Sequence, residues 1–98
     1  MNLDIQGVHM PVAKDTREYL EKKLHRLRHL DDQIVDLRVT LTADHGSILF
    51  GANLHLRWGS DLHVELEAYD EHEGVDLLID KLESAATKDK ERIQEKRR

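Results

Sequence analysis

Side chains that could do catalytic chemistry occur in this chain without the spacing that catalysis needs. Two pairs of closely spaced carboxylates could act together, namely Asp31 with Asp32 and Glu65 with Glu67. Its serines are Ser47, Ser60 and Ser84. No nucleophile motif surrounds any of these serines, no glycine-rich phosphate loop occurs, and the absence of cysteine excludes a thiol nucleophile. The sequence therefore predicts a protein that is not an enzyme and uses no cofactor.

Two histidines are the best candidates for a metal site. The predicted register of a hairpin sets His55 opposite His63 on the solvent face, where two imidazoles could bind zinc. A zinc site needs at least three ligands, and the acids on that face, Glu65 and Glu67, lie only on the diagonal. Two exposed cross-strand histidines are the favoured interpretation, and a zinc-responsive domain is the weakest hypothesis.

Basic side chains form two rows at helical spacing. Lys22, Arg26 and His29 share one face of a first helix, with Lys23 at its border. A flank of a second helix carries Lys81, Lys88, Arg92 and Lys96. If both helices lie side by side on one sheet face, the rows can converge on one strip of phosphate backbone, where counterion release supplies most of the affinity. The alternative is an ordinary solvated face, because acids stand among the bases.

The formal net charge of −5 conceals a strong segregation of charge along the chain. Residues 30–80 carry twelve acids against two bases, whereas residues 81–98 carry seven bases against four acids. Residues 14–29 also have a surplus of bases. This pattern predicts a molecule with a polarised electrostatic field.

Hydrophobic periodicity gives the elements that must position these rows. Alternation of period two predicts strands, and apolar spacing of three and four predicts amphipathic helices. The expected order is strand 2–8, helix 13–29, strand 34–42, strand 48–57, strand 61–69 and helix 71–95. Asp70 and Glu73 form the capping pair of the second helix. No apolar residue lies between Ala86 and Ile93, so this end is expected to project past the core, with thin packing.

The hairpin made by residues 48–57 and 61–69 has a register limited by its alternation. Inward residues must oppose inward residues, because a shift of one residue would turn every side chain to the other face. We therefore expect Leu56 to oppose Leu62, and Leu54 to oppose Val64. The loop between them is then 58–60, or a loop of five residues.

These elements predict an α+β fold of order β-α-β-β-β-α, with two helices packed on one face of a four-stranded sheet. Residues 1–98 form one domain, in which the basic tail 94–98 is expected to fray. No apolar run is long enough to span a membrane, and the N-terminus shows no secretory signal. We expect a cytoplasmic protein.

Trp58 lies at the predicted hairpin tip. It could stack on a base or on another protein, or fold back over Arg57, and the sequence leaves both open. A protein-binding adaptor would use Trp58 with an acidic sheet face made by Asp36, Glu65 and Glu67. This adaptor is the alternative function to binding of nucleic acid.

Three segments of the chain carry a resemblance to a known family. MNLDIQGVHMPV, TREYLEKKLHRLRHLDDQI and LLIDKL followed by a basic run together resemble the ribosome hibernation promoting factors, also called sigma-54 modulation proteins. The resemblance covers essentially the whole chain. The chain resembles the short form of the family, which lacks the C-terminal dimerisation domain of the long form. Many members have Asp-Met-Tyr-Ala where this chain has Asp70, Glu71, His72 and Glu73.

The resemblance implies a fold like that of a double-stranded-RNA-binding domain. It implies binding to the small ribosomal subunit and its ribosomal RNA, in the channel for messenger and transfer RNA, to silence translation in stationary phase or stress. It also implies a monomer off the ribosome, and pairing of ribosomes with the help of a second small factor. The RNA-binding residues that it implies are Lys22, Lys23, Arg26, Lys81, Lys88, Lys90 and Arg92.

Overall fold

The computed structural model describes residues 1–96, apart from the side chains of His29, Asp31 and Lys96. The elements are β1 (Asn2–Val8), α1 (Lys14–Lys23), the 3-10 helix η1 (Leu24–Gln33), β2 (Ile34–Asp44), β3 (Ser47–Leu56), β4 (Asp61–Ala68) and α2 (Glu71–Lys96). The predicted order is confirmed, except that the second half of the first predicted helix is the tighter 3-10 form. The placement of His29 in the first basic row lies outside the described residues.

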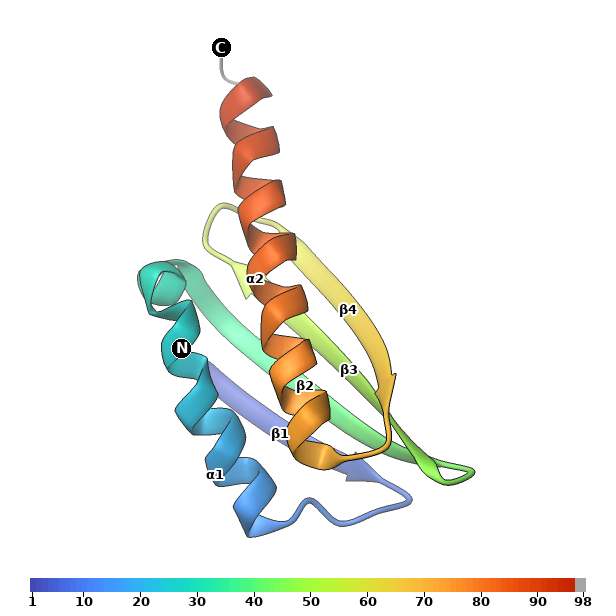
Figure 1. Cartoon of the computed structure of the whole chain (residues 1–98). Helices are drawn as coiled ribbons and strands as arrows, with labels where there is room; N and C mark the ends of the chain where they lie inside the picture. The colour runs from blue at the N-terminus through green and yellow to red at the C-terminus, as the bar shows by residue number, and fades with distance from the viewer. Residues whose placement is uncertain (97–98) are drawn as a thin grey trace.

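The four strands form one sheet in the order β1-β2-β3-β4. β1 runs parallel to β2, and the other neighbours are antiparallel. Both helices cover the same face of this sheet and lie side by side on it (Figure 1). The predicted two-layer α+β arrangement is therefore confirmed.

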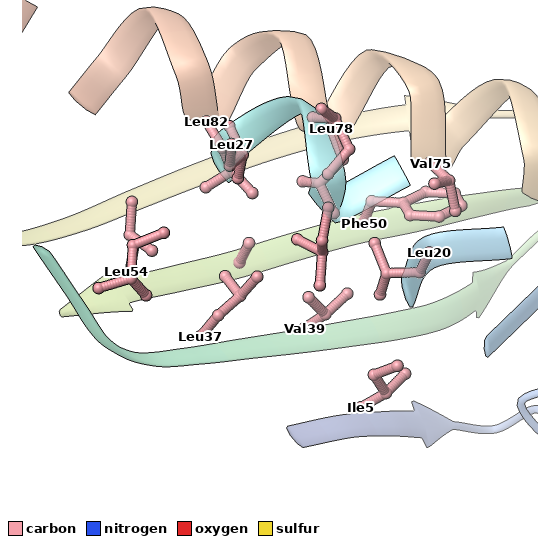
Figure 2. Packing of buried hydrophobic residues seen from close by; sticks show 14 of the residues in the cluster. Ile5, Leu20, Leu27, Leu37, Val39, Phe50, Leu54, Val75, Leu78 and Leu82 are labelled. Atoms are coloured by element: carbon pink, nitrogen blue, oxygen red, sulfur yellow. The ribbon is translucent and has the colours of Figure 1, made fainter. Parts of the chain in front are cut away.

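The core lies between the sheet and the helices, as Figure 2 shows. Alternate residues of the strands meet leucines of α1 and η1 and the apolar stripe of α2. Its members include Ile5, Leu20, Leu27, Leu37, Val39, Phe50, Leu54, Val75, Leu78 and Leu82. At the start of β2 the buried residue is Ile34, whereas strict alternation with Leu37 and Val39 would bury Val35. The alternation breaks there because the register shifts between Ile34 and Asp36, as at a β-bulge.

The predicted register of the β3–β4 hairpin is wrong, because the two strands are shifted by two residues relative to the prediction. Leu54 opposes Leu62, His55 opposes Asp61, and His63 opposes Asn53. Residues 56–60 therefore lie beyond the last pair, which is the loop of five residues. The amide of Leu56 donates to the carbonyl of Ser60 over 2.9 Å and closes this loop. Inward residues still oppose inward residues, so alternation alone allows both registers.

α2 begins where the sequence predicts. The backbone amide of Glu73 donates to the Asp70 carboxylate over 3.0 Å, which is the expected N-terminal cap. The helix has 26 residues and is about 39 Å long, so its end projects past the sheet (Figure 1). It is helical through Lys96; residues 97–98 lie outside the described residues, and fraying of the tail stays a prediction. None of the described helices is long and apolar enough to cross a membrane.

Candidate nucleic-acid interface on the helical layer

The row on α1 and η1 contains one exposed lysine and two cations that face α2. Lys22 is exposed. Lys23 approaches Asp76 of α2, with Nζ 3.5 Å from the carboxylate oxygen. Arg26 lies 2.7 Å from Asp80, and the hydrogen bond that its guanidinium donates to this carboxylate raises the pKa of Arg26. The part of the row nearest α2 is thus paired with acids.

Aromatic and hydrogen-bonded contacts join the two helices further along the same seam. The Tyr19 hydroxyl donates to Asp76 over 2.8 Å, and this bond raises the pKa of Tyr19. His72 stacks on the Tyr19 ring with centroids 4.2 Å apart, and its Nε2 lies 2.8 Å from Asp15. His72 belongs to the segment 70–73, in which this chain differs from the sequence that many members of the resembled family have. Its contacts with Tyr19 and Asp15 join α2 to α1.

The row on α2 faces the other way, toward the sheet edge at β4. Lys81 Nζ donates to the backbone carbonyl of Glu65 in β4 over 2.8 Å. Lys88 and Arg92 line a shallow groove with Leu62 on the same flank. Lys90 is two residues from Lys88, and residues at that spacing do not share a helix face. Lys90 therefore does not belong to this flank.

The sequence predicted that the two basic rows can converge on one strip of phosphate backbone. This prediction is wrong, because the rows lie apart. They lie on opposite flanks of α2, because the flank of α2 that faces α1 carries Asp76 and Asp80. Both rows still belong to the helical layer, and these two acids already hold Lys23 and Arg26. Among the described side chains, those of the two rows that form no ion pair are Lys22, Lys81 and Lys88.

Trp58 is neither a free stacking platform nor folded over Arg57. Its indole Nε1 donates to Asp89 of α2 over 2.7 Å, and its ring is half-buried against the core. Asp89 is only 4 % exposed, although it stands between Lys88 and Lys90 in the sequence. Hydrogen bonds from Ser60 and Trp58 and then the nearby Arg92 hold the pKa of the Asp89 carboxyl below its usual range, against the effect of burial.

A signal for the burial of Asp89 exists in the sequence. Asp89 stands three residues after Ala86 and four before Ile93, so it continues the apolar stripe of α2. A charged residue on such a stripe needs a buried partner, and Trp58 supplies the hydrogen-bond donor.

One known family matches this chain over nearly its whole length. The pattern of the family described as Sigma 54 modulation protein / S30EA ribosomal protein matches residues 3–94. The chain belongs to this family. The family resemblance predicted from the sequence is therefore confirmed, together with its fold.

Relatives in this family carry the name ribosome hibernation promoting factor. The one from Escherichia coli (strain K12) is 30 % identical over 95 residues, which cover 97 % of this chain and 99 % of the relative. The one from Azotobacter vinelandii is 32 % identical over 92 residues, which cover 94 % of this chain and 85 % of the relative.

Two solved structures share the fold of this chain. A ribosomal subunit interface protein from Coxiella burnetii superposes with a TM-score of 0.85 at 31 % identity, covering 92 % of this chain and 98 % of that one. The N-terminal domain of Protein Y from Thermus thermophilus gives a TM-score of 0.76 at 28 % identity, covering 87 % and 94 %.

The open face of the sheet in this S30EA family member is acidic and carries both candidate zinc ligands. Asp36, Glu65 and Glu67 lie at outward positions of their strands, whereas Trp58 packs on the helical side. The adaptor surface predicted from Trp58 and these acids is therefore not continuous.

The histidines of that face are occupied by other partners. His55 Nδ1 lies 2.5 Å from Asp61, and His63 lies 2.8 Å from Asn53 and 2.7 Å from Glu65. Within residues 1–96 as described, no three His, Cys, Asp or Glu side chains are placed to hold a metal ion. The two rings do not oppose each other, so the cross-strand zinc pair was wrong.

Zinc at micromolar concentrations is expected not to bind this protein. Two histidines on different cross-strand rows cannot supply the ligands of a tetrahedral site. Isothermal titration calorimetry with zinc is expected to show only the heat of dilution. A saturable heat that disappears in His63→Ala would contradict this expectation.

Proposed function

We propose that this chain binds the small ribosomal subunit in the channel for messenger and transfer RNA and promotes ribosome hibernation in stationary phase or under stress. The observation that carries the proposal is its membership of the S30EA family over residues 3–94. Relatives named ribosome hibernation promoting factor and ribosomal subunit interface protein support it. The proposal places the protein in the cytoplasm, as a monomer off the ribosome, with a second small factor assisting any pairing of ribosomes.

We assign the contacts with ribosomal RNA to the helical layer. The proposed binding residues are Lys22, Lys23, Arg26, Lys81, Lys88, Lys90 and Arg92. The exposed ammonium groups of Lys22 and Lys88 are free to contact phosphates, since neither forms an ion pair with a described side chain. Arg26 remains partly exposed, and because a guanidinium carries several N–H donors it can hold Asp80 and a phosphate together.

The separation of the two rows indicates the shape of the partner. A helix with its side chains is about 10–12 Å across, so a partner that touches both flanks of α2 must span about that width. A single extended strand would meet one row only. Folded ribosomal RNA, which presents backbone segments on either side of a groove, suits two separate rows.

Sedimentation of a stationary-phase extract tests the proposal. On a sucrose gradient at low salt, the chain is expected to travel with small subunits or with whole ribosomes. Raising the salt concentration is expected to release the chain from the ribosome, because each phosphate contact releases counterions on binding. Each contact therefore makes the negative slope of log binding constant against log salt concentration steeper by about one. A chain that stays at the top of the gradient at low salt would contradict the proposal. Binding whose affinity does not change with salt concentration would also contradict it.

A further inference from the structure

The last turns of α2 are held by the β3–β4 loop. The C-terminal end of this helix projects past the sheet (Figure 1). In the described part of the helix beyond Ala86, Asp89 is the only buried residue and Ile93 is half-buried. A helical end of about ten residues without packing is marginal in water, so whatever contacts Asp89 decides whether this end stays ordered.

The contact consists of one buried carboxylate and two donors. Trp58 Nε1 donates to one oxygen of Asp89 over 2.7 Å, and Arg92 Nη2 donates to the other over 2.5 Å. We call Trp58 and Asp89 the latch. No buried side-chain nitrogen or oxygen of the described residues lacks a partner, so the latch is complete.

Arg92 is the side chain that the latch presents to solvent. Its side chain is 67 % exposed, whereas that of Asp89 is 2 % exposed. One N–H bond of Arg92 holds Asp89, and the remaining donors of the planar guanidinium point away from that bond. A guanidinium that is already held loses less side-chain freedom when it binds a phosphate. Because both oxygens of Asp89 are engaged, this acid is also kept away from an approaching phosphate.

We propose that Trp58 and Asp89 are positioning residues, which keep the end of α2 helical and hold Arg92 in place for a phosphate of ribosomal RNA. This inference rests on the proposed function for the identity of the phosphate donor. Its structural half, the ordering of residues 87–95 by the latch, concerns the free protein and is tested without a ribosome.

Hydrogen exchange of the free protein tests the structural half. Trp58→Phe keeps an aromatic ring and removes the N–H donor, while Asp89→Asn removes the charge that Arg92 needs. Both variants are expected to speed amide exchange in residues 90–95 about tenfold or more, with residues 75–82 unchanged. Tyr69→Phe, at an exposed aromatic residue outside the latch, is the matched control. Unchanged exchange in both latch variants would overturn the inference.

Binding to purified small ribosomal subunits tests the positioning half. Asp89→Asn removes a negative charge, so simple electrostatics predicts tighter binding, whereas loss of positioning predicts binding that is about fivefold weaker. In an Arg92→Ala background, Asp89→Asn is expected to change affinity less than twofold, because its effect passes through Arg92. Equal effects in the two backgrounds, or tighter binding by Asp89→Asn, would overturn the inference.

The two proposals fail in different ways. If the wild-type chain does not bind small subunits at low salt, the proposed function fails, and hydrogen exchange still decides whether the latch orders α2. If the wild-type chain binds and Asp89→Asn binds more tightly, the proposed function stands and the positioning role is wrong.

Discussion

Replacing both Lys22 and Arg26 by glutamate is expected to weaken binding to small ribosomal subunits about a hundredfold or more. Each substitution removes an attraction to phosphate and adds a repulsion, and each lost contact lowers the salt slope by about one. Co-sedimentation at several salt concentrations measures both quantities. Thermal unfolding followed by circular dichroism shows whether the fold persists.

The controls for this variant follow from the helix seam. Arg26 lies 2.7 Å from Asp80, so Arg26→Glu alone would set two acids against each other and could loosen the helices. Adding Asp80→Lys restores an ion pair of opposite polarity without restoring the cation on α1. Lys14→Glu makes the same change of charge as Lys22→Glu at the far end of α1, where Lys14 only pairs weakly with Glu18 over 3.8 Å.

The pattern of losses decides the interpretation. If phosphate binding explains the effect, Lys22→Glu weakens binding, Lys14→Glu has little effect, and Asp80→Lys does not rescue Arg26→Glu. Equal losses from Lys14→Glu and Lys22→Glu would show that only total charge matters. Full rescue by Asp80→Lys would show that Arg26 serves the packing of the helices and not the RNA.

Gly74→Ala is expected to destabilise the fold by about 2 kcal/mol, although alanine favours helices. A Cβ at this position would come well inside contact distance of the Phe50 ring, which is 1 % exposed at the centre of the core. Overpacking of this kind costs about 3 kcal/mol, and the better helix propensity of alanine returns about 1 kcal/mol. For a domain of this size the loss corresponds to roughly 8–16 °C in Tm.

A double-mutant cycle with Phe50→Leu assigns this effect to its cause. The smaller side chain makes room, so Gly74→Ala is expected to cost much less in the Phe50→Leu background than in the wild type. Ser84→Ala, at an exposed position of the same helix, is expected to change stability by less than about 0.5 kcal/mol. Urea unfolding measures all of these variants. A Gly74→Ala protein as stable as the wild type would show that α2 can move away from the sheet.

Gly74 connects this packing to the proposed interface. Because no side chain separates the start of α2 from Phe50, the helix lies directly on β3 and β4. The Lys81 ammonium can then reach the carbonyl of Glu65 in β4. A helix lifted from the sheet would carry its basic flank away from that edge.

Periodicity within the sequence determined most of the architecture. Period-two alternation placed the strands, and the leucines at 20, 24, 27 and 30 placed the buried side of α1 and η1. The capping pair at Asp70 and Glu73 placed the start of α2. These are local properties of the chain, which depend on near neighbours and on which face is buried, so no tertiary information was needed. The family was also recognisable from its segments.

Only the tertiary structure decided the register of the hairpin and the positions of the two basic rows relative to each other. A shift of two residues leaves every inward side chain inward, so alternation cannot distinguish His55 opposite His63 from His55 opposite Asp61. Which flank of α2 faces α1 depends on contacts between residues far apart in the chain, such as Arg26 with Asp80. The hydrogen-bond partner of Asp89 is likewise far away in the chain, because Trp58 lies 31 residues before it. Such long-range contacts are set by how the layers pack together, and no pattern within one segment contains them.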